Sequence, residues 1–505
     1  MLAVLASPAT RDTFAYNTVS AGLHDFSSVV PSNELQRAII SGLDARIECI
    51  QGPPGTGKST TIFHIMQSAI PSGYHCIITC VQNKALDSIA EKLGPTGMPF
   101  IVYGHPSRLG DEAKKFTLPA QVARDPEVLR IRAILSPMEG RRKLIRSRMT
   151  LIETSRFHKR APRNPWKRWW LAYVTTQHAL YHALKQDADE CDRCCQRLTG
   201  ALGEAETTAR ASIMMDSKAS LSTMDGLVSA DLLPRPSIVI IDEAGTVPEY
   251  KFPLLLTHHV EAIVAIGDQN QLQPFSHTKD DQGEKPDGFF QRAVKALDEK
   301  VPMLKEQYRM HPAISDLVSN LFYRGELTTA PSILERRMAV PRGGIEWRDY
   351  PDMDAESPDR VKKWNPVEVD MIGTFMCDEL PRLLRNGKSV AIITFYKHHF
   401  NKIMEMGEEM GAVYTKTEAK AKPGAGRFKD ANFRIVTVDA AQGSEADVIV
   451  LSCVRCNRQR TLGFITDKNR LCVALSRARE QLIIIGSSKT LSSDRTWRMV
   501  ASAAK

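Results

Sequence analysis

The sequence predicts an α/β fold with parallel sheets that are covered by helices on both faces. Short apolar runs rich in β-branched residues recur along the chain, and helical stretches separate them. The predicted strands span residues 46–50, 75–80, 237–241, 262–266, 389–393, 433–438, 447–451 and 482–485. No internal repeat or low-complexity tract interrupts this alternation. With 505 residues, the chain is long enough for two or three packed units.

The alternation breaks between residues 95 and 210, where the sequence is charged, helical in pattern and without a convincing strand. Two long helices are predicted there, over residues 127–150 and 175–208. Because this stretch lies between strands of one predicted sheet, we interpret it as an α-helical insertion. Polar segments that contain Pro and Gly predict loops over residues 277–288, 340–366 and 420–430.

The net charge of +9 is concentrated in one segment of the chain. Between Arg141 and Trp170 there are eleven basic residues and one acidic residue, so the rest of the chain is close to neutral. Such a block favours a polyanionic partner, and a solvated basic helix face is the alternative. Trp166, Trp169 and Tyr173 lie among these cations and can stack bases, but we prefer packing for most of the aromatic residues.

The ten cysteines predict reduced, packed thiols and no structural zinc. Cys49, Cys76 and Cys472 lie inside apolar strand-like runs, and the close pair Cys453 and Cys456 has no second pair at zinc-like spacing. No signal peptide or long apolar span is found. We therefore expect an intracellular protein, cytoplasmic or nuclear, without a membrane partner.

A glycine-rich segment with the pattern G-x-x-x-x-G-K-[ST] joins the first predicted strand to a helix over residues 60–70. Backbone N–H groups of such a loop turn toward phosphates at a helix N-terminus, where the helix dipole favours negative charge. Lys58 would bridge the β- and γ-phosphates of ATP, and the Ser59 hydroxyl would bind Mg²⁺. The residues assigned to nucleotide contacts in this segment are Gly52, Pro53, Pro54, Gly55, Thr56, Gly57, Lys58, Ser59 and Thr60.

Two further polar groups follow predicted strands of the same sheet. Asp242 and Glu243 end the strand at residues 237–241, where Asp242 can reach the Mg²⁺ shell and Glu243 can act as a base toward the attacking water. Gln271 follows the strand at residues 262–266 and can contact the γ-phosphate or the attacking water. Alone, each pattern also fits an ordinary polar turn, but together with the glycine-rich loop they predict an ATP hydrolase.

The order of these motifs along the chain resembles that of the superfamily-one helicases, most closely the branch of the nonsense-mediated mRNA decay helicase. The matching segments are residues 52–59, 241–243, 267–274, 306–312, 438–445 and 473–479. The resemblance implies two RecA-like P-loop lobes with ATP between them. It covers roughly residues 32–93 and 211–486, and leaves the helical insertion weakly covered.

The resemblance also assigns roles to single residues. Gln36 resembles the glutamine that reads the adenine edge, and Tyr308 the aromatic residue that stacks on adenine. Arg309 and Arg477 resemble two arginine fingers that reach ATP from the second lobe, although a surface salt bridge is the commoner fate of an arginine. Glu445 resembles a residue near the γ-phosphate or the ribose. Hydrolysis would then depend on closure of the two lobes.

The family grips one strand across both lobes, mainly through its backbone. The matching residues here are Gln82, Asn83, Ser220, Thr223, Thr394 and Tyr396, to which we add Arg142 and Lys143 of the insertion. A Ser/Thr pair is often a helix cap or a turn, so this structural interpretation stands beside the functional one.

The domain organisation that follows has six parts. These are an N-terminal segment (1–30), the first lobe (31–94 and 211–305), the helical basic insertion (95–210), the second lobe (306–490) and a C-terminal tail (491–505). The family's β-barrel ahead of the Gln36 motif and its Cys/His-rich regulatory region are not found in this sequence. This departure leaves partner regulation, processivity and strand separation open.

The predicted function is ATP-dependent translocation along single-stranded RNA or DNA, in the 5′-to-3′ direction that the resemblance implies. We expect a monomer that needs ATP and Mg²⁺, with regulatory protein partners. The alternatives are a nucleotide-gated clamp that hydrolyses ATP without moving, and a scaffold with a decayed site. All six expected catalytic residues are present, which argues against the scaffold.

Overall fold

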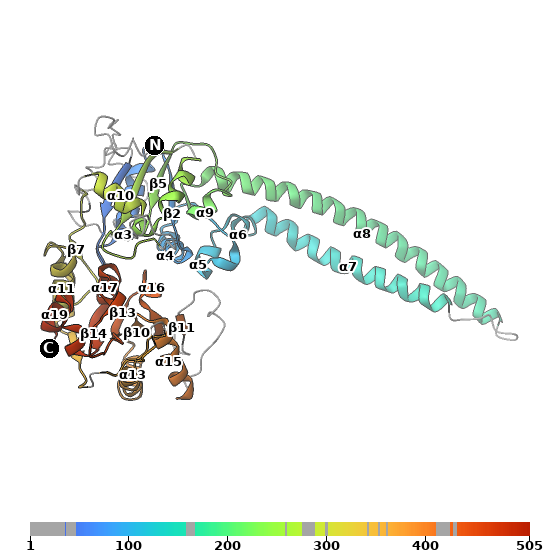
Figure 1. The fold of residues 1–505 in the computed structure, drawn as a ribbon. Coiled ribbons are helices and arrows are strands. Elements are labelled where there is room, and N and C mark those ends of the chain that lie inside the picture. Colours follow the sequence, from blue (N-terminus) through green and yellow to red (C-terminus); the bar gives the residue numbers. More distant parts are fainter. Residues whose placement is uncertain are drawn as a thin grey trace. The chain divides into compact units, whose positions relative to one another are not determined.

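The computed structural model contains two compact units (Figure 1), one formed by residues 1–96, 222–230 and 234–505 and the other by residues 97–221 and 231–233. The structure describes residues 36, 47–157, 167–257, 260–274, 288–297, 301–340, 343–351, 354–359, 362–410, 425–427 and 432–504. The expected N-terminal segment (1–30), Trp166 and most of the loops expected at 277–288 and 420–430 lie outside these residues.

The first sheet of the larger unit consists of parallel strands in the order β1-β6-β5-β2. These strands are β1 (Ile47–Gln51), β2 (His75–Cys80), β5 (Ser237–Ile241) and β6 (Val260–Gly267). The helices that accompany them are α3 (Lys58–Ala69), α4 (Asn83–Leu93), α9 (Met224–Leu227) and α10 (Phe289–Ala296). All residues of β2 and β5 are buried, as is typical of parallel strands covered on both faces.

The second sheet has the order β11-β12-β10-β13-β14-β9, and all its pairs are parallel except β11 with β12. Its strands are β9 (Gly344–Arg348), β10 (Val390–Thr394), β11 (Ala425–Arg427), β12 (Phe433–Thr437), β13 (Ala446–Ser452) and β14 (Ala478–Ile485). The surrounding helices are α11 (Pro312–Phe322), α12 (Pro331–Met338), α13 (Pro366–Asp378), α14 (Leu380–Arg385), α15 (Lys397–Glu409), α16 (Val438–Ala441), α17 (Lys468–Leu475), α18 (Ser488–Leu491) and α19 (Arg495–Ala503). A short parallel pair, β7 (Glu306–Gln307) and β8 (Thr328–Thr329), precedes this sheet along the chain.

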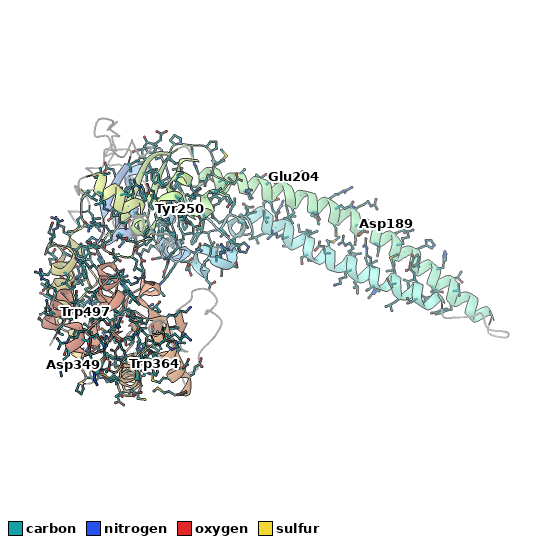
Figure 2. All side chains as sticks on the ribbon, in the orientation of Figure 1. Asp189, Glu204, Tyr250, Asp349, Trp364 and Trp497 are labelled. Carbon is teal, nitrogen blue, oxygen red and sulfur yellow. The ribbon has the colours of Figure 1, made fainter. Side chains whose placement is uncertain are left out.

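Alternate residues of the second sheet serve two separate hydrophobic cores. Ile393 and Leu451 belong to one core, which also contains the fully buried Trp497 labelled in Figure 2. Ile392 and Val450 belong to the other core, on the opposite face. The prediction of two α/β lobes with parallel sheets is therefore confirmed.

The smaller unit is dominated by two long helices, α7 (Pro126–Phe157) and α8 (Lys167–Asp216), and also contains α5 (Asp111–Lys114) and α6 (Leu118–Val122). Buried and half-buried residues recur on each helix at alternating spacings of three and four, which is the heptad pattern of a coiled coil. On α7 these residues are Val128, Ile131, Leu135, Met138, Arg142, Ile145, Met149 and Ile152. On α8 they are Tyr181, Leu184, Ala188, Cys191, Cys195, Leu198, Leu202, Ala205 and Ala209. Despite the length of α7 and α8, no helix within the described ranges is long and apolar enough to cross a membrane.

Two expectations about loops and strands were wrong. The insertion contains a strand, β3 (Phe100–Tyr103), and β4 (Ala219–Thr223) follows its second helix. The predicted loop at 340–366 contains β9, which forms the edge of the second sheet beside β14. Strand β9 contains the charged residues Glu346 and Arg348, which form an ion pair with each other at 2.7 Å. Charged residues are common in edge strands, and because of them the sequence of β9 resembles that of a loop.

Candidate nucleotide-binding site

The glycine-rich segment runs from the end of β1 into α3, as the sequence predicted. Gly55 and Gly57 both have a φ of 78°, in the left-handed region that glycine adopts at little cost. A Cβ atom on Gly55 would lie 2.7 Å from the Cβ of Arg309, so the close approach of the second lobe also requires glycine here. The segment therefore has the backbone that a phosphate-binding loop needs at a helix N-terminus.

Hydrogen bonds hold this loop on several sides. The Gly52 N–H donates to the Gly267 carbonyl at 2.7 Å, and the Tyr308 N–H donates to the Gly55 carbonyl at 2.8 Å. The Gln36 side-chain amide donates to the Thr56 carbonyl at 3.2 Å and is almost fully buried. Gln36 thus contacts the phosphate-binding loop directly, and its contact with an adenine edge stays a proposal.

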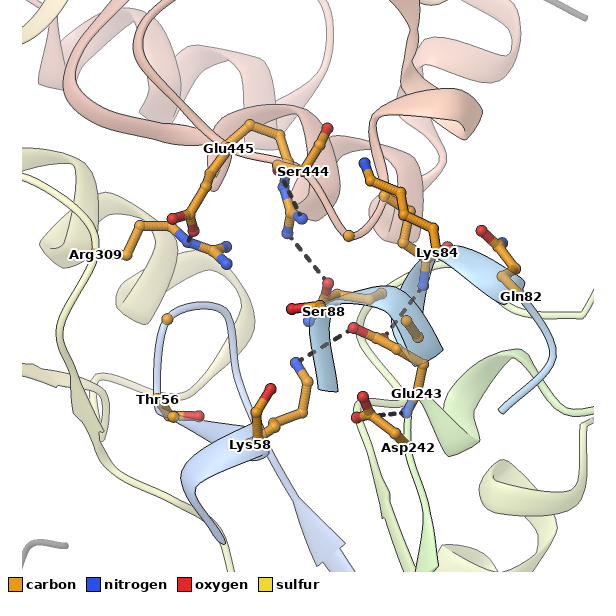
Figure 3. Close-up of a pocket in the computed structure, with 18 of the residues that line it drawn as sticks. Thr56, Lys58, Gln82, Lys84, Ser88, Asp242, Glu243, Arg309, Ser444 and Glu445 are labelled. Carbon is orange, nitrogen blue, oxygen red and sulfur yellow. Dashed lines mark hydrogen bonds and ion pairs between the residues drawn. The ribbon is translucent and has the colours of Figure 1, made fainter. Parts of the chain in front are cut away.

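Two carboxylates lie at the end of β5, beside the loop (Figure 3). Burial, followed by the neighbouring Glu243, raises the pKa of Asp242 to about 6, while Lys58 opposes this shift. Glu243 has a φ of 52°, which costs on the order of 1 kcal/mol for a residue other than glycine. Its carboxylate lies 3.9 Å from Lys58 Nζ and accepts a hydrogen bond from Gln442 Nε2 at 3.5 Å.

A chain of buried hydrogen bonds begins at Asp268, just beyond β6. The Asp268 carboxylate accepts hydrogen bonds from Tyr323 Oη at 2.6 Å and from Gln271 Nε2 at 2.7 Å. The other end of the Gln271 side chain, Oε1, accepts a hydrogen bond from Arg477 Nη2 at 3.2 Å. Burial raises the pKa of Asp268, although the charge of Lys58 and the hydrogen bonds that Asp268 accepts oppose the shift. Gln271 therefore connects the first lobe to an expected arginine finger of the second.

The two expected arginine fingers lie close enough to influence each other. Burial, and then the charge of Arg309, lower the pKa of Arg477 to about 10, so Arg477 stays charged at neutral pH. Arg309 Nη1 donates to the Ser476 carbonyl at 3.4 Å. Its Nε forms an ion pair with the Glu445 carboxylate, which also pairs with Arg479. Glu445 thus contacts Arg309 and Arg479 within the same cavity as the phosphate loop, and its place near a γ-phosphate or ribose stays a proposal.

One cavity of 790 Å³ connects these elements. Its volume is within the usual range for small-molecule sites, which is about 300–1,000 Å³. The expected site residues that line it are Gly55, Thr56, Gly57, Lys58, Ser59, Gln82, Asp242, Glu243, Gln271, Tyr308, Arg309, Glu445 and Arg477. Gln36, Gly52, Pro53, Pro54, Thr60 and Asn83 are not among the lining residues, although each is adjacent to one in sequence or by hydrogen bond.

Several lining residues were missed by the sequence analysis. Arg479, Arg434 and Gln442 contribute side chains to the cavity, and Lys92 contributes from the end of α4. Arg479 and Gln442 lie inside segments that matched the helicase motifs, so the match could have indicated that they lie near the nucleotide. Arg434 lies in β12 outside the matched segments, and only the fold brings it to the cavity.

The donor set fits a magnesium–triphosphate group. Asp242 is a buried carboxylate next to a second carboxylate, and burial and then Glu243 raise its pKa. No cluster of three or more His, Cys, Asp or Glu that could hold a metal ion occurs in the described part of the chain. Ser59 and Asp242 would hold Mg²⁺, which in such sites uses one or two protein oxygens together with phosphates and waters.

Three of the residues expected to bind nucleic acid have buried side chains, so their contact with a strand stays a prediction. The exposed fractions of Ser220, Thr394 and Tyr396 are 1%, 0% and 7%, so a contact with a strand would need these side chains to become more exposed. Tyr396 Oη accepts a hydrogen bond from Arg455 Nη1 at 3.3 Å. Thr223 caps α9 by accepting from the Gly226 N–H at 3.2 Å, which is the structural role that such residues often have. Gln82 and Asn83, at the start of α4, keep accessible surface.

The basic block of the insertion is partly neutralised within the coiled coil. Arg146 pairs with Asp192 of α8 at 2.7 Å, and Arg142 approaches the same carboxylate at 3.8 Å. Arg141 approaches Asp187 at 3.9 Å. Figure 2 shows the neighbouring acid Asp189 on the same helix. Lys143 is exposed, so it remains a candidate for phosphate contact, whereas Arg142 has a carboxylate partner.

Comparisons with known proteins find related sequences along most of the chain. Two family models, each described as an AAA domain, match residues 31–279 and 287–489. A regulator of nonsense transcripts 1 homolog of Arabidopsis thaliana is 27% identical over 478 residues, which cover 91% of this chain and 33% of that protein. The DNA polymerase alpha-associated DNA helicase A of Schizosaccharomyces pombe is 26% identical over 468 residues, which cover 88% of this chain and 61% of that protein.

The chain spans about a third of the first relative and about three fifths of the second. The solved complex of arterivirus nonstructural protein 10, a helicase, with DNA is 12% identical and covers 93% of this chain and 66% of that one. Its TM-score of 0.39 is too low to support an argument. The sequence relatives and the family models carry the assignment: the chain belongs to the superfamily-one helicases, in the branch that contains the nonsense-mediated mRNA decay helicase.

Proposed function

We propose that the chain is an ATP-dependent motor that moves along single-stranded RNA or DNA in the 5′-to-3′ direction. One observation carries the proposal. Lys58, Asp242 and Glu243 of the first lobe and Arg309 and Arg477 of the second lobe line a single cavity. Hydrolysis in such a cavity depends on both lobes, so each catalytic cycle can be coupled to their relative motion.

Several side chains of the cavity have separate parts in the proposed reaction. Lys58 and the loop N–H groups orient the triphosphate, and Glu243 accepts a proton from the attacking water. Arg309 and Arg477 stabilise the negative charge that develops in the transition state. A Mg²⁺ ion held by Ser59 and Asp242 would neutralise charge on the β- and γ-phosphates.

Two contacts support communication between strand binding and hydrolysis. Gln442 donates to the carboxylate of Glu243, the proposed base, at 3.5 Å. The residues that follow Gln442 lead directly to Glu445, the partner of Arg309. A strand that displaces this segment would therefore change both the base and an arginine finger, which is a physical route to nucleic-acid-stimulated hydrolysis.

The nucleic acid itself is proposed only as a class. The names of the two relatives refer to nonsense transcripts in one case and to a DNA helicase in the other. Side-chain amides at Gln82 and Asn83 and the exposed Lys143 suit contacts to phosphate and sugar, which do not read bases. We further propose a monomer with regulatory protein partners, in the cytoplasm or the nucleus, with the six-part domain organisation given above.

The decisive experiment measures ATP hydrolysis without nucleic acid, with single-stranded RNA and with single-stranded DNA. Glu243→Gln should bind ATP but lose turnover by a factor on the order of 10² or more, because the base is removed while the phosphate loop is intact. Stimulation by neither polymer would contradict the proposed motor. A stimulated enzyme that fails to displace streptavidin from a biotinylated strand would instead be a nucleotide-gated clamp.

A further inference from the structure

Glu445 directly precedes β13 and is contacted by three arginines in different ways. Its Oε2 pairs with Nε of Arg309, and Figure 3 shows these two labelled side chains meeting above the phosphate loop. Its Oε1 accepts hydrogen bonds from Arg479, including one from Nε at 3.0 Å. Arg434 Nη2 donates to the backbone carbonyl of Glu445 at 2.6 Å and leaves the carboxylate to the other two. One carboxylate is thus shared by an arginine finger and a second arginine.

The carboxylate of Glu445 is stabilised in its ionised form by the neighbouring arginines. Burial alone would raise the pKa of Glu445, but the guanidinium groups of Arg309 and Arg479 lower it to about 2. The side chains of Arg309, Glu445 and Arg479 are 19%, 31% and 38% exposed, so solvent screens their charges only in part. The negative charge of Glu445 therefore competes with the terminal phosphate of the nucleotide for Arg309.

Arg479 is anchored on the side away from the finger. Its Nη1 lies 3.7 Å from Asp447. The Asp447 carboxylate is itself fixed by the N–H and the hydroxyl of Ser389, at 2.9 and 2.7 Å. Arg479 can therefore stay in place and keep Glu445 when Arg309 turns away from it. The finger has no comparable carboxylate anchor other than Glu445 among the described residues.

We propose that Arg479 is a positioning residue, which retains Glu445 so that Arg309 can exchange that carboxylate for the terminal phosphate of the nucleotide. This inference rests on the proposed hydrolysis of ATP. Arg479 acts through Glu445 and is not required to touch the nucleotide. Without Arg479, the whole charge of Glu445 faces Arg309, and the exchange for phosphate becomes less favourable.

The proposed role of Arg479 predicts different kinetics for the single and the double variants. Arg479→Gln should raise KM for ATP or lower kcat/KM on the order of tenfold, the effect expected when one charged hydrogen-bond partner is removed. Glu445→Gln in the same chain should restore most of the activity, because it removes the charge that holds the finger. If Arg479 bound the nucleotide itself, the second substitution could not replace it.

The experiment measures kcat and KM for ATP in the full chain for wild type, Arg479→Gln, Glu445→Gln and the double variant. Arg434→Gln is the matched control. It removes an equal charge from the same cavity, but Arg434 donates to the backbone carbonyl of Glu445 and not to its carboxylate. Rescue of Arg479→Gln by Glu445→Gln, without rescue of Arg434→Gln, is the expected result. Additive losses in the double variant, or wild-type kinetics for Arg479→Gln, would overturn the inference. A wild-type chain that does not hydrolyse ATP would refute the proposed function and with it this inference, whereas an active wild type with additive losses would refute the inference alone.

Discussion

The side chain of Gln271 accepts a hydrogen bond from Arg477 at 3.2 Å and donates one to Asp268 at 2.7 Å. Both polar ends of the amide are used, and both partners are buried. Tyr323 donates to the same Asp268 carboxylate at 2.6 Å, so the amide is one link in a fixed chain. Gln271 is therefore one of the groups that orient Arg477, a proposed arginine finger.

Gln271→Leu should lower kcat by a factor on the order of 10², since it removes one buried hydrogen-bond partner from Arg477 and one from Asp268. Binding of ATP should change much less, because the phosphate loop does not depend on Gln271. Asn270→Ala is a matched control: it removes another contact between the lobes, from Asn270 Nδ2 to the Phe322 carbonyl at 2.9 Å, without touching the finger. Equal losses in both variants would attribute the effect to general contact between the lobes.

The pH dependence of hydrolysis should have an acidic limb near 6. Burial and Glu243 raise the pKa of Asp242 to about 6 in the free enzyme. The carboxylate is the form that can hold Mg²⁺, so kcat/KM should fall as the pH decreases through this value. Raising the Mg²⁺ concentration should move the limb to lower pH, because the cation competes with the proton. A flat kcat/KM profile from pH about 5 to 8 would contradict this role.

The phosphate loop and the carboxylates that follow β5 were predictable because each depends on a short contiguous pattern. Gly52 to Ser59 joins a strand to a helix, and Asp242 ends a strand whose residues are all buried. Relationships between distant residues were not predictable. Nothing in the sequence pairs Asp268 with Tyr323, which lies 55 residues further along the chain. Only the fold brings them together.

The charged block of the insertion shows the same limit. The sequence reveals the basic residues of α7 but not which acids neutralise them. Arg146 meets Asp192, 46 residues away, because the two helices fold back on each other in register. Likewise, Thr394 ends a strand where the helicase resemblance expects a strand contact, but neighbouring elements cover it completely. Motif spacing identifies candidates, and burial decides which of them can touch a ligand.

A buried carboxyl group in the second lobe should make stability depend on pH. Burial raises the pKa of Glu368 to about 7, although hydrogen bonds from Ser452, Val454 and Tyr350 oppose the shift. The folded state therefore keeps a proton that the unfolded chain releases near pH 4.5. The resulting stabilisation is present below that pH and is lost as the pH rises toward 7, by up to about 3 kcal/mol.

Glu368→Gln removes the titrating group, so the decrease in Tm between pH about 5 and 8 should become shallower in this variant. The neutral amide still has an oxygen that can accept from the Val454 N–H and from Ser452, so the network is not abolished. Glu356→Gln is a useful comparison, because Lys363, Asn457 and Arg455 lower the pKa of that carboxyl group despite its burial. An unchanged slope for Glu368→Gln would show that Glu368 does not titrate in this range.

The exposed cations of α7 should contribute to nucleic-acid affinity more than the paired ones. Lys143 and Arg148 are exposed, whereas Arg146 forms a 2.7 Å ion pair with Asp192 in the coiled coil. Replacing Lys143 and Arg148 with Glu should reduce the dependence of affinity on salt, by about 0.7 in the logarithmic slope for each phosphate of a single strand that the protein no longer neutralises. Fluorescence anisotropy between about 50 and 200 mM salt measures this slope. Lys185→Glu, on the exposed surface of α8, is the control for net charge alone.

Reversal of Arg146 should instead weaken the pairing of the two helices, which a lower Tm would report. If the slope does not change when both exposed cations are reversed, α7 does not contact phosphates.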